Sequence, residues 1–130
     1  MIEIYVDGAS QGNPGHSGAG VYIKAHGHQY EYAFPLGMHT SHEAEFLAVL
    51  KALELCQNQF PNEILSFRSD SQIVVDAIEA GYTKNKRFQP LLTEIIEKGN
   101  QFPLYFFKWI PSKQNHHADR LAKQAIHENY

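Results

Sequence analysis

The order of strand and helix patterns along the chain is the strongest constraint on its fold. Three strand patterns follow one another with short connections near the N-terminus, which is typical of an antiparallel meander. Helix and strand patterns alternate after that, and such β-α-β steps favour parallel pairing through right-handed crossovers. The order βββαβααβα therefore predicts an α/β fold with a mixed sheet and helices packed over it. The predicted strands span residues 2–7, 21–25, 29–34, 64–70 and 103–110, and the predicted helices span 41–58, 72–80, 88–98 and 114–127.

Two local signals refine this pattern. Thr40 and Glu43 have the spacing of a capping box at the start of helix 41–58. The segment from Gly8 to Gly20 is rich in glycine, and such segments can cradle phosphates. It has no lysine and runs into a strand rather than a helix, so we interpret it as a connection whose glycines tolerate positive φ.

Size and composition set broad limits on the protein. A chain of 130 residues with 43% hydrophobic residues fits one domain, residues 1–130, with a real core. The single cysteine, Cys56, permits no internal disulfide and favours a reducing compartment. No signal-peptide pattern or apolar run of membrane-spanning length is present, so we expect a cytoplasmic protein that does not enter membranes. A monomer is expected because no coiled-coil seam is evident.

Charge is distributed unevenly along the chain. Residues 1–80 hold three Lys or Arg against ten Asp or Glu, whereas residues 81–130 hold eight against four. The basic second part can meet phosphates, and a bound cation would neutralise part of the acidic first part. An ordinary solvated surface explains the same distribution, so charge alone leaves both interpretations open.

Four carboxylates stand at positions that are unusual for a purely structural acid. Asp7 and Asp70 end predicted strands, and Glu45 and Asp119 lie in the first turns of apolar helices. Each has an ordinary explanation by itself, as a turn residue, a helix cap, a charge favoured by the helix dipole or the border of an apolar face. Together they have no matching cluster of Lys or Arg, and grouped oxygen ligands indicate a divalent cation such as Mg²⁺ or Mn²⁺. Metal-assisted chemistry on phosphate is the leading hypothesis.

Four motifs then resemble one known family. They are Asp7-Gly8-Ala9-Ser10 with Gly12-Asn13-Pro14-Gly15, Thr40 to Glu45, Ser69-Asp70-Ser71-Gln72, and Asn115-His116-His117-Ala118-Asp119 followed by Leu121-Ala122. In this order and context the chain resembles the type 1 branch of the ribonuclease H family over nearly its whole length. The resemblance implies the ribonuclease-H-like fold, a five-stranded mixed sheet with helices on both faces.

The resemblance also implies an activity and its residues. It implies a metal-dependent endonuclease that cleaves the RNA strand of RNA–DNA hybrids and leaves 5′-phosphate and 3′-hydroxyl ends. The implied catalytic and metal-binding residues are Asp7, Glu45, Asp70 and Asp119, with Asp7 shared between two Mg²⁺ ions and Mn²⁺ as the other candidate. The implied substrate-binding residues are Gly8, Ser10, Asn13, Thr40, Ser41, His42, Ser71, Gln72 and Asn115. His116 and Lys113 are candidate auxiliary residues.

Two departures from the family pattern place the chain beside a bacterial subgroup that lacks the basic protrusion. Residues 81–88 are too short for that protrusion, although Lys84, Lys86 and Arg87 keep some of its charge. Residues 110–114 lack the loop histidine that the family enzymes usually carry. Two alternatives therefore stay open: a nucleic-acid-binding protein with little or no cleavage activity, and a related single-strand or structure-specific nuclease.

Overall fold

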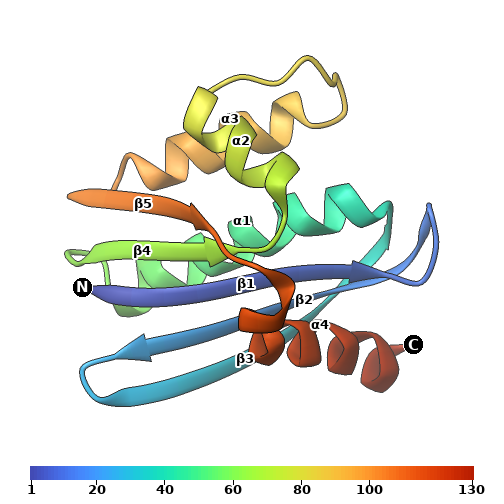
Figure 1. Ribbon diagram of the computed structural model, residues 1–130, viewed down its shortest axis with the longest axis horizontal. Coiled ribbons are helices and arrows are strands. Elements are labelled where there is room, and N and C mark those ends of the chain that lie inside the picture. Colours follow the sequence, from blue (N-terminus) through green and yellow to red (C-terminus); the bar gives the residue numbers. More distant parts are fainter.

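The computed structural model describes residues 1–130 and consists of one sheet with helices on both of its faces (Figure 1). Three strands come first, and helices and strands alternate afterwards, as the pattern predicts. The elements are β1 (Ile2–Ser10), β2 (Gly15–Ala25), β3 (His28–His39), α1 (Ser41–Gln59), β4 (Ile64–Ser69), α2 (Gln72–Ala80), α3 (Gln89–Gly99), β5 (Leu104–Trp109), a 3₁₀ turn at Ser112–Gln114, and α4 (His116–Asn129).

The strand order in the sheet is β3-β2-β1-β4-β5. β1 pairs with β2 and β2 with β3 in antiparallel fashion, whereas β1–β4 and β4–β5 are parallel. The predicted five-stranded mixed sheet, with strands 1–3 antiparallel, is therefore confirmed. This order places β1 and β4 side by side in the middle of the sheet, so that their carboxyl ends meet at one edge.

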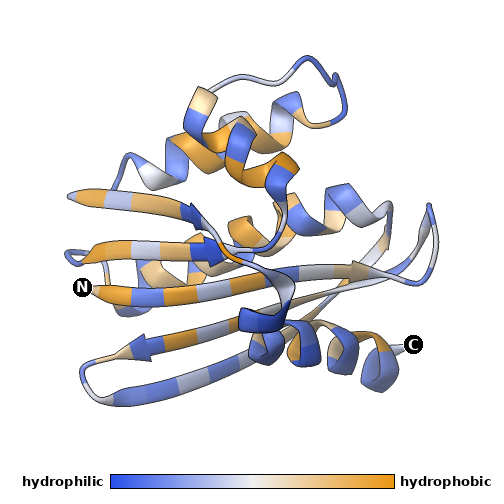
Figure 2. Cartoon of the chain, viewed as in Figure 1, coloured by the Kyte–Doolittle hydropathy of each residue, from blue (hydrophilic) through white to orange (hydrophobic).

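Alternation along the strands separates the two faces of the sheet. Ile2, Ile4 and Val6 on β1 are fully buried in the core on the α1 side, whereas Glu3 and Tyr5 between them are only half-buried. The α1 helix starts with the predicted capping box, because the Glu43 amide donates to Thr40 Oγ1 at 3.2 Å and the Thr40 amide donates to Glu43 Oε1 at 2.8 Å. Figure 2 shows the hydrophobic stripes of the helices turned towards the sheet.

The glycine-rich segment corrects one expectation. β1 and β2 continue through most of it, so only the residues between Ser10 and Gly15 form the connection. Positive φ at glycine occurs at Gly27, Gly37 and Gly81, none of which lies in this segment. The segment needs small residues for a different reason, since helices pack directly against its backbone.

Two glycines of the segment from Gly8 to Gly20 allow one helix to pack closely on each face of the sheet. A Cβ atom on Gly8 would overlap the backbone of Ala44 in α1, and one on Gly20 would overlap the Ala118 carbonyl oxygen in α4. Gly8 and Gly20 thus fix how closely α1 and α4 can pack on opposite faces of the sheet.

The other differences concern the ends of elements. α4 begins at His116 rather than at residue 114, because residues 112–114 form the 3₁₀ turn that precedes it. The segment between α2 and α3 is a short loop, so no protrusion is present. None of the helices combines the length and the hydrophobicity that a membrane span requires.

Candidate metal centre

Three of the four predicted carboxylates meet where the central strands end. Asp7 lies near the end of β1, Asp70 follows β4, and Glu45 is in the first turns of α1. Each offers a carboxylate oxygen, and these oxygens all lie within 4.8 Å of one another. The parallel pairing of β1 with β4 brings the two aspartates together, and the close approach of α1 at Gly8 brings Glu45 to them.

Burial governs the ionisation of this cluster. Asp7 is 6% exposed, and burial, together with the charges of Glu45, Asp70 and Asp119, raises its pKa to about 10. Burial also raises the pKa of Glu45, although hydrogen bonds to Asp7 and from the Gly8 amide act in the opposite direction. The Gly8 amide donates to Glu45 Oε1 at 2.6 Å and holds that carboxylate in place. Without a counter-charge, the cluster therefore retains a proton at neutral pH.

The donor set fits a divalent cation that prefers oxygen ligands. All three groups are carboxylates, and no Lys or Arg side chain forms an ion pair with any of them. A cation in the cluster would offset both the burial and the repulsion that raise the Asp7 pKa. We therefore treat the cluster as a candidate metal centre.

Asp119 stands apart from the other three. It lies in the first turn of α4, and its Oδ2 pairs with Lys123 Nζ one turn later at 3.0 Å. It is still close enough to contribute to the raised pKa of Asp7. The structure thus places Asp119 at the border of the cluster, with a cationic partner of its own.

Asn115, which the sequence predicts to bind substrate, lies inside the protein and supports the cluster. It is 1% exposed, and its Nδ2 donates to the Val6 carbonyl at 2.9 Å and to Asp70 Oδ1 at 3.3 Å. Its Oδ1 is buried without a hydrogen-bond partner. A side chain enclosed in this way positions Asp70 and joins the ends of β1 and β4 to the start of α4.

Ser71 takes the capping role beside Asp70, and Trp109 holds the Asp70 backbone. Ser71, which is buried, is the N-cap of α2 and accepts a hydrogen bond from the Val74 amide. The Trp109 indole N–H donates to the Asp70 carbonyl oxygen at 3.2 Å. Trp109 was not among the predicted site residues, although its position at the end of the last predicted strand was a usable signal.

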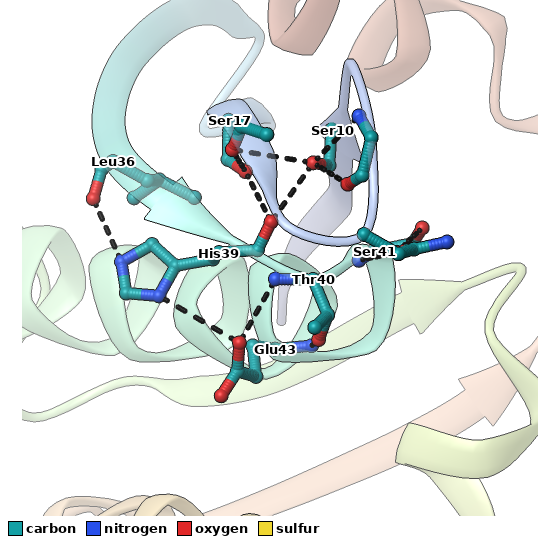
Figure 3. Close-up of polar contacts among 10 residues, drawn as sticks. Ser10, Ser17, Leu36, His39, Thr40, Ser41 and Glu43 are labelled. Atoms are coloured by element: carbon teal, nitrogen blue, oxygen red, sulfur yellow. Dashed lines mark hydrogen bonds and ion pairs between the residues drawn. The ribbon is translucent and has the colours of Figure 1, made fainter.

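A second polar group lies at the start of α1, beside the tip of the β1–β2 hairpin (Figure 3). Asn13 Oδ1 accepts hydrogen bonds from both the amide and the hydroxyl of Ser41, each at 2.8 Å. Ser10 Oγ donates to the His39 carbonyl oxygen at 2.9 Å and so ties the hairpin tip to the end of β3. Asn13, Thr40 and Ser41 therefore surround the N-terminus of α1.

Known proteins with similar sequences identify the family of this chain. A family described as reverse transcriptase-like matches residues 5–125. A ribonuclease H of Desulforamulus reducens is 32% identical over 140 residues, covering 95% of this chain and 86% of that protein. The chain belongs to the type 1 ribonuclease H family. A putative hydrolase of Enterococcus faecalis, EbsB, is 40% identical over 131 residues and covers 100% of this chain and 97% of its own length.

Solved ribonuclease H structures share the whole fold. The RNase H1 of Halobacterium salinarum has a TM-score of 0.90 at 28% identity and covers 98% of both chains. LC11-RNase H1, solved in complex with an RNA/DNA hybrid, has a TM-score of 0.91 at 30% identity with the same coverage.

The remaining predicted residues of this ribonuclease H family member lie outside the carboxylate cluster. His42 is exposed at the start of α1, and its ring meets the Phe88 ring edge-on with centroids 6.2 Å apart. Gln72 is exposed and donates to Asp76 Oδ1 at 2.7 Å. His116 and Lys113 are both exposed, His116 as the first residue of α4 and Lys113 within the 3₁₀ turn.

Proposed function

We propose that this protein is a metal-dependent ribonuclease H that hydrolyses the RNA strand of RNA–DNA hybrids. One observation carries the proposal: three carboxylates, from β1, α1 and the end of β4, offer oxygens within 4.8 Å of one another. The family supports the reaction class, and a neighbour of the same fold has been solved with an RNA/DNA hybrid.

The residues of the chain would hold and orient the reacting groups. Asp7, Glu45 and Asp70 would hold two Mg²⁺ or Mn²⁺ ions, and Asp119 would complete the set from α4. When bound, the cations would supply an activated water and stabilise the leaving 3′ oxygen, which gives 5′-phosphate and 3′-hydroxyl ends. Asn115 keeps Asp70 in position, and the Gly8 amide does the same for Glu45.

The start of α1 would bind the substrate backbone. Helix N-termini attract phosphate because the helix dipole is positive there. In α1 the Ser41 and Glu43 amides already donate to Asn13 and Thr40, so the side chains around this end would make the contacts. Asn13, Thr40 and Ser41 surround this end, and His42 is exposed next to them. We infer that they contact phosphates or 2′-hydroxyls of the hybrid. Of these groups, the 2′-hydroxyl is the one that distinguishes RNA from DNA.

The decisive experiment is cleavage of labelled RNA–DNA hybrid, double-stranded RNA and single strands, each with Mg²⁺ and with Mn²⁺. Wild type should cut only the RNA strand of the hybrid, and only with metal. Glu45→Gln should abolish cleavage, whereas Glu54→Gln, the same change at an exposed position of α1, should leave it intact.

Other outcomes would contradict the proposal. Cleavage of single strands in preference to hybrid would indicate a related nuclease. Hybrid binding without cleavage in either metal would indicate a binding protein with an inactive centre. Activity retained by Glu45→Gln would remove the carboxylate cluster from the reaction.

A further inference from the structure

One face of the sheet is only partly covered. α4 packs on β1, β2 and β3, on the face opposite α1, and β4 and β5 extend beyond it (Figure 1). On this face Phe106 and Lys108 of β5 are exposed, whereas Arg68 of β4 is partly buried and Ser66 of β4 is buried.

Strand register places two rows of side chains across this face. Residues directly opposite one another on paired strands project to the same side of the sheet, which gives each row one residue from each of β2, β1, β4 and β5. The first row is Tyr22, Tyr5, Arg68 and Lys108, and the second is Lys24, Glu3, Ser66 and Phe106.

The cations of these rows outnumber the acids by three to one. Arg68 pairs with Glu3 and also donates to the Tyr5 hydroxyl at 3.0 Å. Lys24 and Lys108 are exposed and form no ion pair. The face therefore keeps two uncompensated positive charges, one on β2 and one on β5.

Aromatic rings lie among these charges. Lys24 Nζ and the Arg68 guanidinium are 5.8 and 5.3 Å from the centre of the Tyr5 ring, which holds both cations against the sheet. Phe106 is 47% exposed on β5, beside the cations, and no other aromatic ring stacks on it. Figure 2 shows how hydrophobic β5 is, although it is the edge strand of the sheet.

We propose that this face, which we call the strand platform (Tyr5, Lys24, Arg68, Phe106 and Lys108), binds a single strand of nucleic acid. Proteins that bind single strands combine cations that follow the backbone with aromatic rings on which bases stack. Lys24 and Lys108 would bind phosphates, Arg68 would stay paired with Glu3, and a base would stack on Phe106. Four neighbouring strands span about 14 Å, so the platform contacts a length of backbone rather than one phosphate.

The strand platform adjoins the carboxylate cluster. Tyr22 of the first row stacks on His117, two residues before Asp119, with ring centroids 4.2 Å apart. On the β5 side, Trp109 follows Lys108 and donates to the Asp70 carbonyl oxygen. An unpaired strand beside a hybrid would therefore pass from the cluster onto the platform. Binding on the platform needs no metal and goes beyond the proposed hydrolysis.

The test measures binding of fluorescein-labelled oligothymidylate to the full chain by anisotropy, in EDTA and over a series of salt concentrations. The double variant Lys24→Gln/Lys108→Gln should lower affinity about tenfold or more. It should also make the slope of log affinity against log salt shallower by about 1.4, because it removes two phosphate contacts and each contact on a single strand contributes about 0.7. Phe106→Ala should lower affinity about fivefold or more without changing the slope, because it removes stacking rather than charge.

A matched control separates this surface from overall charge. Lys51→Gln/Lys98→Gln makes the same change in net charge on α1 and α3, on the opposite side of the sheet, and should bind like wild type. Thermal melts of all variants establish that each is folded. The proposal is overturned if the platform variants and the control bind alike, or if wild type does not bind the oligonucleotide at low salt. It is also overturned if sedimentation shows a wild-type dimer that Phe106→Ala dissociates, because the face would then bind a second copy.

Discussion

Asp7 shows how a single residue connects stability with the proposed chemistry. A carboxylate on a central strand, 6% exposed and near three other acids, is a costly choice for a structural role. Its high pKa means that the metal-free protein holds a proton where a loaded centre would hold a cation. The same buried carboxylates that destabilise the metal-free protein would therefore bind the metal.

This has a measurable consequence for pH dependence. The pKa of Asp7 rises from 3.8 to about 10 on folding, so between these values the folded protein binds a proton that the unfolded chain releases. Metal-free stability should therefore fall as the pH rises through this window, by up to about 1.4 kcal/mol per pH unit for this one proton. Asp7→Asn should flatten that dependence and stabilise the metal-free protein by about 1 kcal/mol or more at neutral pH.

Urea unfolding in EDTA at several pH values measures this effect, with Asp76→Asn as the matched change at an exposed position. Adding Mg²⁺ should stabilise wild type and have little effect on Asp7→Asn, because a ligand that binds only the native state raises its stability. Wild type and Asp7→Asn with the same pH dependence in EDTA would contradict the assigned pKa shift.

Residue patterns predicted part of the candidate site, for physical reasons. Asp7 and Asp70 are visible because each ends a predicted strand, and in the structure they follow the last paired residues of the parallel strands β1 and β4. The pairing of Asp119 with Lys123 follows from their spacing of four residues and was open to prediction. The buried hydrogen bonds of Asn115 could not be predicted, because they join residues more than forty positions apart and depend on the final packing of α4.

At the scale of elements, the packing of α4 against β2 depends on a residue with no side chain. Strand and helix types were predictable from hydrophobic periodicity, yet the glycines of residues 8–20 indicated a loop where the structure has strands. A glycine is equally compatible with a turn and with close helix packing, and only the tertiary structure decides between them. The lengths of β1 and β2 were underestimated for this reason.

Gly20→Ala tests that packing. Its new methyl group would overlap the Ala118 carbonyl oxygen, and backbone atoms of α4 can yield only if the helix shifts. We expect a loss of about 1–3 kcal/mol in the free energy of unfolding and reduced cleavage at saturating substrate, since Asp119 and Asn115 move with α4. Gly27→Asn is the control, because that position is open and asparagine tolerates its positive φ. Wild-type stability in Gly20→Ala would show that α4 adapts without strain.

At the scale of the whole molecule, the structure shows where part of the basic second half of the sequence lies. The loop that carries Lys84, Lys86 and Arg87 ends at Phe88, whose ring packs 4.8 Å from Phe46 of α1. The hydrogen bond with Thr40 is the main cause of the lowered pKa of Glu43, and the positive charge of Arg87 lowers it further. The loop therefore lies beside the start of α1, where the proposed phosphate contacts are, and supplies positive charge without a protrusion.

Hybrid binding should accordingly depend weakly on salt. Each phosphate contact contributes about −0.9 to the slope of log affinity against log salt on a B-form duplex, so few contacts give a slope on the order of −2 to −4. Measured in the Glu45→Gln background, in which cleavage should be abolished, replacing Lys84, Lys86 and Arg87 with Ala should lower hybrid affinity and make the slope shallower. In the wild-type background, turnover at saturating hybrid should stay nearly unchanged. Lys51→Ala/Lys98→Ala, on more distant parts of α1 and α3, should alter the slope much less per charge removed. If the triple variant keeps both wild-type affinity and slope, the loop is only a solvated turn, and the phosphate contacts lie elsewhere on the molecule.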